Sequence, residues 1–395
     1  MMSLTTEPSR MDCKEAGFSE EVLERLNDHF AQLIKADKIQ CASYVLARHG
    51  KVFADGAMGR LRFDRPESVM NKDSIRRIAS VTKLFTAVAI FQLIEEGKLF
   101  LRQSVADWIE EFKHPLYESI NIMHLLTHTS GLRADPFYYL EPYPAGWGSV
   151  LFAYQPETEG PHAITDSEEL AKQQRTAWIR ALLSGKPLSK PGEEWNYSSA
   201  GYTVLGEVIA RVSGMRYEEY VMERIVKPLG LERTFFVVPE ELQDEVCIIN
   251  EWESSRLSSK LGPNDAPRAG GGLYSTLSDL NRFGQMLLNG GAVDGVRIMS
   301  RKSVEKMISN CLDKGIDAFS WGGRLKDKAY GLGPLLIAPG EWIEEDTYGH
   351  EGAGRCILLL DQKRQAVILF FVPSNSDWCP ESMIGTQNVI GAGWL

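Results

Sequence analysis

A serine and a lysine three residues apart, Ser80 and Lys83, are the residues whose types and spacing point most directly to chemistry. Apolar residues follow at helical spacing, so residues 81–96 are expected to form a largely buried helix. On one face of that helix the lysine amine can approach the serine hydroxyl, and burial can remove the charge that prevents an amine from acting as a base. N–H groups at the helix N-terminus can receive a developing oxyanion. The pair therefore suits acyl transfer.

The same spacing occurs again at Ser303 and Lys306. This copy lies in the charged stretch SRKSVEKM, without apolar surroundings that would lower the pKa of a lysine, so we expect it on a solvated helix face. His124 and His128 share the spacing of one helix face, but zinc usually needs three or four ligands. We interpret them as structural histidines. The sequence has no G-x-S-x-G, P-loop or H-E-x-x-H motif.

A tyrosine, Tyr197, follows a Pro-Gly turn in KPGEEWNYSSAGY and precedes a helical stripe over residues 200–213. A tyrosine at such a junction can pass protons between a serine and a leaving group. The alternative is a core tyrosine with a satisfied hydroxyl.

The glycine-rich segment HEGAG at residues 350–354 precedes a strand-like run at 356–361. Its glycines would let a strand edge approach a ligand closely. An N–H from this edge, together with the N–H of Ser80, would form an oxyanion hole. Taken by itself, the segment is only a glycine-rich turn.

The elements that must position these residues follow a simple order along the chain. Residues 43–59 alternate about the turn pair His49-Gly50 and predict a hairpin. Further strand-like runs lie at 356–361 and 366–372, so we expect a sheet completed by both ends of the chain. Helical patterns occur at residues 20–36, 81–96, 104–112, 119–128, 168–184, 200–213, 217–227, 276–289 and 301–312.

Composition excludes several classes of protein. The 395 residues carry 43 Lys and Arg against 53 Asp and Glu, a net charge of −10, which makes nucleic acid an unsuitable partner. No run approaches the roughly 20 apolar residues of a membrane span. The first twenty residues show no signal peptide pattern, so the expected compartment is the cytosol. Six sparse cysteines without a C-x-x-C pair are expected to be reduced thiols.

Taken together, these segments resemble the serine β-lactamase-like superfamily, in particular the group of class C β-lactamases, penicillin-binding proteins and family VIII carboxylesterases, which also holds lovastatin-type acyltransferases. The motifs occur in the family's order as RIASVTKLFTA, WNYSSAGY and GHEGAG. Supporting stretches are LLTHTSGL, KPLGL and GGLYSTLSDLNRFGQMLLNGG. The likeness extends over most of residues 20–372.

The resemblance implies roles for individual residues. Ser80 would be the acylated nucleophile, Lys83 its base and Tyr197 the proton relay, with the N–H groups of Ser80 and Ala353 binding the oxyanion. No metal or organic cofactor is implied.

The implied fold is α/β (α+β), with an antiparallel sheet flanked by helices. Residues 18–78 and 275–395 would form a discontinuous sheet domain, with a mainly helical domain at 79–274 inserted in it and an N-terminal tail at 1–17. The site would lie in the cleft between the two domains.

Two departures from the family pattern concern the substrate. The tyrosine motif usually ends in Asn, which touches the acylamide of β-lactam or peptide substrates, but here Ser199 stands there. The third motif, usually Lys-Thr-Gly or His-Thr-Gly, is His350-Glu351-Gly352, and an acidic Glu351 would repel a substrate carboxylate unless it points away. Both changes are compatible with neutral esters.

The segment 133–165 is long, aromatic and without a sustained period. In this superfamily the region lies near the cleft mouth, so its aromatic residues are candidates for an acyl or alcohol pocket, with simple surface packing as the alternative. The candidates are Phe137, Tyr138, Tyr139, Tyr143 and Trp147.

The leading hypothesis is a serine hydrolase that acts through an acyl-enzyme on a small ester or amide, of the carboxylesterase type. The alternatives are a β-lactamase or DD-peptidase, which the absent export signal disfavours, a small-molecule acyltransferase, and a non-catalytic binding protein that retains the fold. The sequence leaves the physiological substrate and the oligomeric state undetermined.

Overall fold

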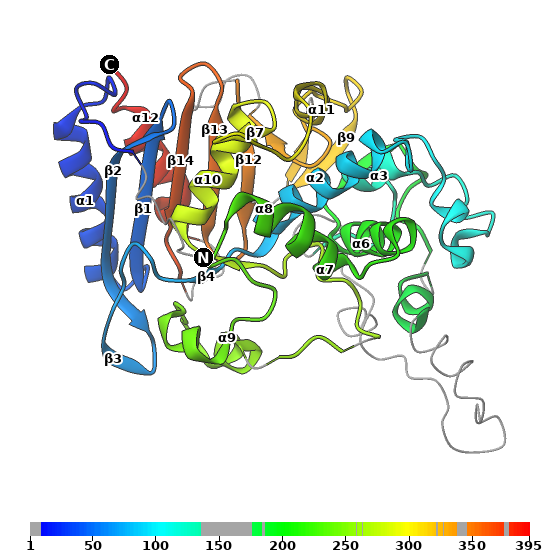
Figure 1. Ribbon diagram of the computed structural model, residues 1–395, viewed down its shortest axis with the longest axis horizontal. Helices are drawn as coiled ribbons and strands as arrows, with labels where there is room; N and C mark the ends of the chain where they lie inside the picture. Colours follow the sequence, from blue (N-terminus) through cyan, green and yellow to red (C-terminus); the bar gives the residue numbers. More distant parts are fainter. Residues whose placement is uncertain are drawn as a thin grey trace.

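The structure, a computed structural model, describes residues 9–135, 176–183, 186–257, 259–262, 264–320, 323–326, 328–337, 346–374 and 379–395. Within these ranges the largest element is a seven-stranded sheet of order β11-β12-β13-β14-β1-β2-β3, in which all neighbours are antiparallel (Figure 1). Its strands are β1 (Cys41–Arg48), β2 (Lys51–Arg62), β3 (Arg65–Val69), β11 (Leu335–Leu336), β12 (Thr347–Gly352), β13 (Cys356–Asp361) and β14 (Ala366–Phe371). Because β1 pairs with β14, both ends of the chain complete the sheet, as the sequence predicts.

The β1–β2 hairpin turns at His49 and Gly50, whose φ values are 50° and 79°. Positive φ at both central residues is the geometry of a type I′ turn, whose twist matches that of the flanking strands. The hairpin predicted over 43–59 is therefore confirmed.

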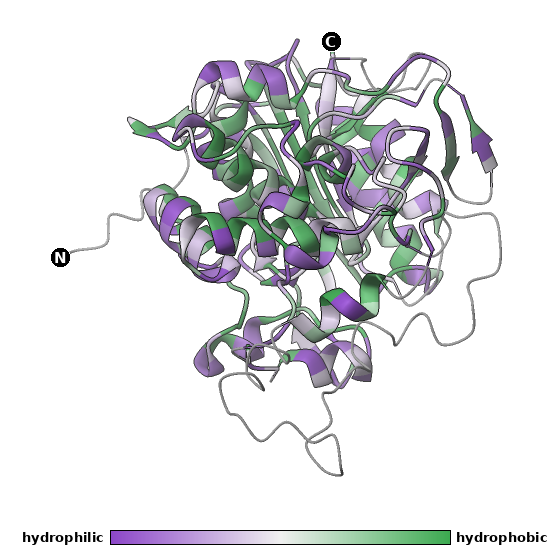
Figure 2. Ribbon diagram, turned by 90° about the vertical axis from the view of Figure 1, so that its right-hand side faces the viewer, coloured by the Kyte–Doolittle hydropathy of each residue, from purple (hydrophilic) through white to green (hydrophobic). Residues whose placement is uncertain are grey.

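Helices cover both faces of the sheet, because side chains alternate along its strands. Ile357 and Leu359 of β13 pack on one side, and Leu358 and Leu360 on the other. Figure 2 shows apolar residues gathered in the strands and in the inward faces of the helices. The covering helices are α1 (Glu20–Lys35) and α12 (Thr386–Gly391) on the first side, and α2 (Thr82–Glu95) and α10 (Leu277–Leu288) on the second.

The other helices lie around α2 and below the sheet (Figure 1). α2 is buried along nearly its whole length and packs against α6. These helices are α3 (Ile122–Leu126), α6 (Ser199–Ser213), α7 (Tyr217–Val221), the π-helical turn η4 (Met222–Val226), α8 (Lys227–Leu229), α9 (Glu251–Leu257) and α11 (Arg301–Met307).

The helix predicted at 104–112 is wrong. The segment forms two separate 3-10 turns, η2 (Val105–Asp107) and η3 (Glu110–Phe112). Ile109 between them has φ −121° and ψ 106°, an extended conformation that interrupts the helical hydrogen bonding. Of the helix predicted at 168–184, residues 176–183 are described, and they are helical.

Short strands complete the scaffold. The site depends on β4 (Arg76–Arg77), which pairs with β6 (Tyr274–Ser275), and on β5 (Glu194–Asn196), which runs parallel to β9 (Asp317–Ser320). The remaining short strands are β7 (Ala292–Val293), β8 (Val296–Arg297) and β10 (Gly323–Leu325).

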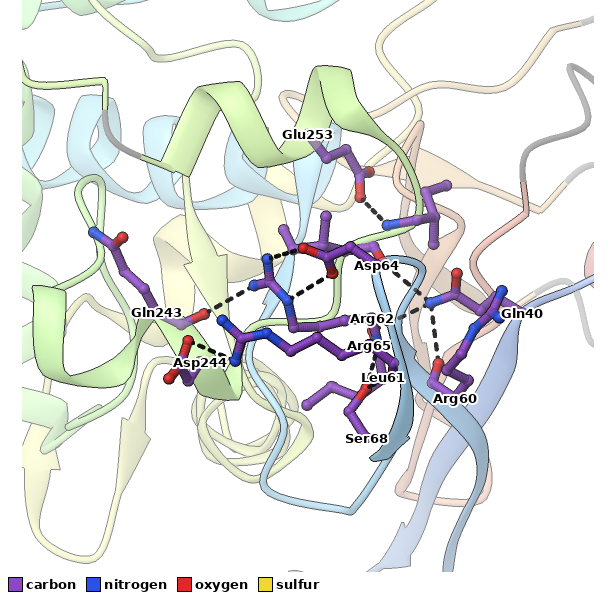
Figure 3. Close-up of polar contacts among 12 residues, drawn as sticks. Gln40, Arg60, Leu61, Arg62, Asp64, Arg65, Ser68, Gln243, Asp244 and Glu253 are labelled. Carbon is purple, nitrogen blue, oxygen red and sulfur yellow. Dashed lines mark hydrogen bonds and ion pairs between the residues drawn. The ribbon is translucent and has the colours of Figure 1, made fainter.

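The edge of the sheet at β2 and β3 holds the segment that leads into α9 (Figure 3). The Gln40 amide donates to the carbonyl oxygens of Arg60, Leu61 and Ile248 at 3.0–3.1 Å. The Arg62 guanidinium binds both carboxylate oxygens of Asp64 at 3.0 Å. The Gln40 bond to Ile248 holds the chain just before α9, which carries a carboxylate that the site uses.

Candidate active site

The candidate nucleophile lies at the start of the helix that the sequence predicts over residues 81–96. Ser80 belongs to a 3-10 turn, η1 (Ala79–Val81), which leads into α2. Ala79 has φ 44°, a region that residues with a Cβ rarely adopt and that costs about 1–3 kcal/mol. Ser80 is partly exposed, whereas Ala79 and Val81 are buried. The strained turn thus leaves the Ser80 hydroxyl partly exposed, while the residues on either side of it are packed in the core.

Lys83 is fully buried, and its Nζ lies 3.0 Å from Ser80 Oγ. It also donates to Ser199 Oγ at 3.1 Å and to the Gly270 carbonyl oxygen at 2.7 Å. Burial lowers the pKa of Lys83 to about 8, and the negative charge of Asp135 opposes this shift. A lysine with such a pKa is substantially neutral in mildly alkaline solution and can accept a proton.

Asp135 is the site residue that sequence reasoning missed. Its Oδ2 accepts from the Ser199 hydroxyl at 2.6 Å and its Oδ1 from the Ser199 N–H at 2.8 Å, while its own N–H donates to the Tyr197 carbonyl oxygen at 2.7 Å. Ser199, expected to contact substrate, thus bridges Asp135 and Lys83. No motif spacing marks the aspartate, which lies 64 residues before Ser199.

The Gly270–Gly272 run explains how a backbone carbonyl reaches Lys83. A Cβ on Gly270 would lie 3.1 Å from the Ser199 carbonyl oxygen, and one on Gly272 would lie 2.3 Å from the Arg268 side chain. A side chain on Gly270 would therefore crowd the start of α6, and one on Gly272 would clash within the turn itself.

Tyr197 follows β5, and its ring lies 4.7 Å from Lys83 Nζ, measured to the ring centroid. It packs on the buried His128 ring, with 4.3 Å between centroids and 35° between planes. The structure thus brings two of the predicted residues, Ser80 and Tyr197, close to the amine of the third, Lys83.

The two histidines predicted to be structural, His124 and His128, each make hydrogen bonds within the fold. His124 completes a capping box with Asn121 at the start of α3. His128 Nδ1 accepts from the Ser198 N–H at 3.0 Å, so a neutral ring donates through Nε2 to the Tyr330 hydroxyl at 3.1 Å. Burial lowers the pKa of His128.

His350 joins the same buried group from β12. Its Nε2 lies 3.3 Å from the Tyr330 hydroxyl, and its Nδ1 lies 2.6 Å from the Glu351 carbonyl oxygen, which can only accept. Burial and the Lys83 charge lower the pKa of His350 to about 3. His350 is therefore neutral near pH 7, and its ring lies 6.1 Å from the Tyr197 ring.

Glu351 is partly exposed, and neighbouring residues of a strand point to opposite faces, so it projects away from the face that carries His350. Burial raises the pKa of Glu351, while the charges of Lys328 and Arg355 lower it.

The turn after β12 lies directly against Ile78, the residue that precedes the 3-10 turn of Ser80. A Cβ on Gly352 would lie 2.2 Å from the Ile78 carbonyl oxygen, so only glycine permits this approach. The buried Arg76 guanidinium donates to the Gly354 carbonyl oxygen at 2.9 and 3.2 Å and pairs with Glu253 of α9 at 2.5 Å. Ala353, between the two glycines, is exposed. Its backbone therefore lies in a turn fixed beside η1.

The second S-x-x-K copy differs in its surroundings. Lys306 is exposed on α11, as predicted, but Ser303 is buried, and its hydroxyl lies 3.1 Å from that of Ser300. The predicted pocket residues Phe137, Tyr138, Tyr139, Tyr143 and Trp147 lie outside the described residues. In the described part of the chain, no group of three or more His, Cys, Asp or Glu could hold a metal.

Comparison with known proteins identifies the class. A family model described as Beta-lactamase matches residues 26–378. The chain therefore belongs to the β-lactamase family of serine hydrolases, as the order of its motifs predicts.

Individual relatives differ in what they are called. Esterase EstB of Burkholderia gladioli is 33% identical over 220 residues, which cover 55% of this chain and 52% of EstB. An uncharacterized protein of Mycobacterium tuberculosis is 32% identical over 260 residues, 60% of each chain. A penicillin-binding protein homologue from Caulobacter crescentus has the same fold, with a TM-score of 0.69 and 20% identity over 95% of this chain and 98% of that one. The chain thus spans little more than half the length of the two curated relatives, EstB and the Mycobacterium tuberculosis protein.

No helix in the described ranges is long and apolar enough to cross a membrane.

Proposed function

We propose that this protein is a serine hydrolase that cleaves small esters through an acyl-enzyme on Ser80. The observation that carries the proposal is the buried Lys83 amine, 3.0 Å from the Ser80 hydroxyl and with a pKa lowered to about 8. The likeness to an esterase, EstB, supports the ester as substrate.

In the proposed reaction, Ser80 Oγ attacks the ester carbonyl carbon while its proton passes to Lys83 Nζ. The carbonyl oxygen becomes an oxyanion, which the N–H groups of Ser80 and Ala353 would bind. As the tetrahedral intermediate collapses, the alcohol leaves with a proton relayed by Tyr197. Water then attacks the acyl-enzyme by the reverse sequence.

The charges around the site favour a neutral substrate. His350 is neutral near pH 7 because its pKa lies at about 3, so the third motif brings no imidazolium to a substrate carboxylate. Asp135 adds a carboxylate 2.6 Å from the Ser199 hydroxyl. An anionic substrate would meet repulsion at this point.

The test compares hydrolysis of p-nitrophenyl acetate and butyrate by the wild type and by Ser80→Ala. We expect Ser80→Ala to lower kcat/KM by about 10³-fold or more, because the nucleophile is lost. Ser303→Ala, in the second S-x-x-K copy, is the matched control and should keep wild-type activity. Equal activity of wild type and Ser80→Ala, with both folded by circular dichroism, would overturn the proposal.

A β-lactamase or penicillin-binding role is the second candidate, supported by the family model over residues 26–378. Labelling with a fluorescent penicillin, followed by mass mapping, tests it: attachment to Ser80 would favour this role, and absence of label would remove it. Acyl transfer is tested by adding candidate alcohol acceptors during ester turnover. A non-catalytic protein would give no adduct with a fluorophosphonate.

A further inference from the structure

The contact between Asp135 and Ser199 determines the direction of the hydrogen bonds around Lys83. Asp135 holds Ser199 twice, through Oδ1 to the backbone N–H at 2.8 Å and through Oδ2 to the hydroxyl at 2.6 Å. A carboxylate only accepts hydrogen bonds. The Ser199 hydroxyl hydrogen must therefore point toward Asp135, which leaves the Ser199 oxygen as an acceptor on its other side.

That remaining side of Ser199 Oγ faces Lys83 Nζ at 3.1 Å. The Gly270 carbonyl oxygen, which can only accept, lies 2.7 Å from the same nitrogen. A neutral amine has two N–H bonds and one lone pair. With both N–H bonds directed to these two acceptors, the lone pair is left for the third neighbour, Ser80 Oγ, at 3.0 Å.

We propose that Asp135 is a positioning residue that acts through Ser199 to aim the lone pair of neutral Lys83 at the Ser80 hydroxyl. The inference rests on the proposed function and adds to it a residue outside the three motifs. Without Asp135, the Ser199 hydroxyl could rotate and donate its hydrogen to the Lys83 lone pair. Lys83 would then be blocked as a base, although its distance to Ser80 was unchanged.

The step concerned is acylation. The Ser80 O–H bond breaks as its proton forms a bond with Nζ, and the oxygen electron pair forms the bond to the ester carbonyl carbon. The carbonyl π pair moves to oxygen. Lys83 becomes an ammonium whose three N–H bonds match the same three oxygens, so the site needs no rearrangement after the transfer.

The decisive variant is Asp135→Asn, which keeps shape and removes the carboxylate. The Ser199 backbone N–H keeps the amide oxygen in the Oδ1 position, so the amide nitrogen replaces Oδ2 and donates to Ser199 Oγ. The direction of that hydrogen bond is thereby reversed. We expect the pH-independent kcat/KM for p-nitrophenyl butyrate to fall about 100-fold, the scale of a misaligned catalytic group.

A purely electrostatic role predicts the opposite sign near pH 7. The Asp135 charge raises the pKa of Lys83, so its removal would lower that pKa and increase the neutral fraction of the lysine. Activity of Asp135→Asn that equals or exceeds that of wild type at pH 7 would overturn the positioning role.

A double-mutant cycle separates positioning from a general structural effect. If Asp135 acts through Ser199, Asp135→Asn should have little further effect in a Ser199→Ala background. A full additional loss in the double variant would refute the route through Ser199. Asp107→Asn, at an exposed aspartate, is the charge control, and urea unfolding of each variant reports structural damage.

Failure of the proposed function gives a different result. If wild type and Ser80→Ala hydrolyse the ester equally, the function falls before Asp135 is tested. If wild type is active and Asp135→Asn has the same pH-independent kcat/KM as wild type, the function stands and the positioning role is refuted.

Discussion

Lys83 combines burial with three hydrogen-bond partners, and its titration is the most direct residue-scale property to measure. Burial lowers its pKa to about 8 because the charged form loses hydration. The proposed base is the neutral form, which exists above that pKa. Ester hydrolysis is therefore expected to rise with pH.

We predict that kcat/KM for p-nitrophenyl butyrate reaches half its plateau near pH 8. At pH 6 only about 1% of the amine would be neutral, so activity should be about 100-fold below the plateau. Rates corrected for spontaneous hydrolysis give the profile. An inflection near 6.5, the ordinary pKa of a histidine, would contradict the assignment.

At the scale of elements, the turn between β12 and β13 depends on an ion pair from outside the sheet. Arg76 of β4 binds the Gly354 carbonyl oxygen, the Cys247 carbonyl oxygen and Glu253. The Leu61 carbonyl oxygen of β2 accepts from the Ile248 N–H at 3.1 Å, and Arg65 of β3 pairs with Asp244 at 2.9 Å, so both strands hold the segment before α9 (Figure 3). α9 supplies Glu253. The turn of the proposed oxyanion hole is thus fixed by contacts from two segments that are distant from it in sequence, β2 to β4 and α9.

Replacing Arg76 with Met should therefore impair both stability and activity. It leaves Glu253 buried without its partner, which costs about 3–5 kcal/mol of unfolding free energy. Urea unfolding and ester hydrolysis measure the two effects.

The double variant Arg76→Met/Glu253→Gln should recover part of the stability but not kcat, because the Gly354 carbonyl oxygen remains unheld. Recovery of full activity in the double variant would show that Arg76 contributes stability alone. Arg62→Met, in the neighbouring contacts with Asp64, is the comparison variant, and it should affect stability more than kcat.

At the scale of the whole molecule, we propose that residues 79–274 are inserted into a sheet domain formed by 18–78 and 275–395, and that the two parts fold together. One apolar cluster contains Val45 of β1, Phe85 of α2 and Leu205 of α6, and so includes residues of both proposed parts. The C-terminal residue also contacts the segment before α1, since the Leu395 N–H donates to the Gly17 carbonyl oxygen at 3.0 Å.

Separate expression of residues 1–186 and 187–395 should therefore yield no cooperatively folded fragment. The first fragment lacks β12–β14, so β1 loses its partner β14, and the second lacks α2. Circular dichroism during urea titration provides the measurement.

A circular permutant tests whether opening the chain after residue 186 is by itself enough to prevent cooperative folding. It has the same opening after residue 186 and its native ends joined by a flexible linker, and it should retain a cooperative transition. A cooperative transition in either fragment alone would contradict the nested arrangement.

Local pattern was sufficient for most elements but not for all of them. α1, α2 and the β1–β2 hairpin follow from apolar periodicity and turn residues, which act between near neighbours in sequence. The pattern at 104–112 predicted one helix, but the extended Ile109 divides the segment into two 3-10 turns. Periodicity reports a favourable face and does not report such a backbone break.

The sequence by itself determined the class of protein, because its motifs occur in the family's order. It also predicted Ser80, Lys83 and Tyr197 as the catalytic residues, with Ser80 and Lys83 one helical turn apart. Only the tertiary structure decided what surrounds the lysine. The Gly270 carbonyl oxygen and the Asp135–Ser199 pair reach Nζ from segments far along the chain. The pKa and hydrogen-bond direction of a buried amine depend on such distant partners, and no local spacing encodes them.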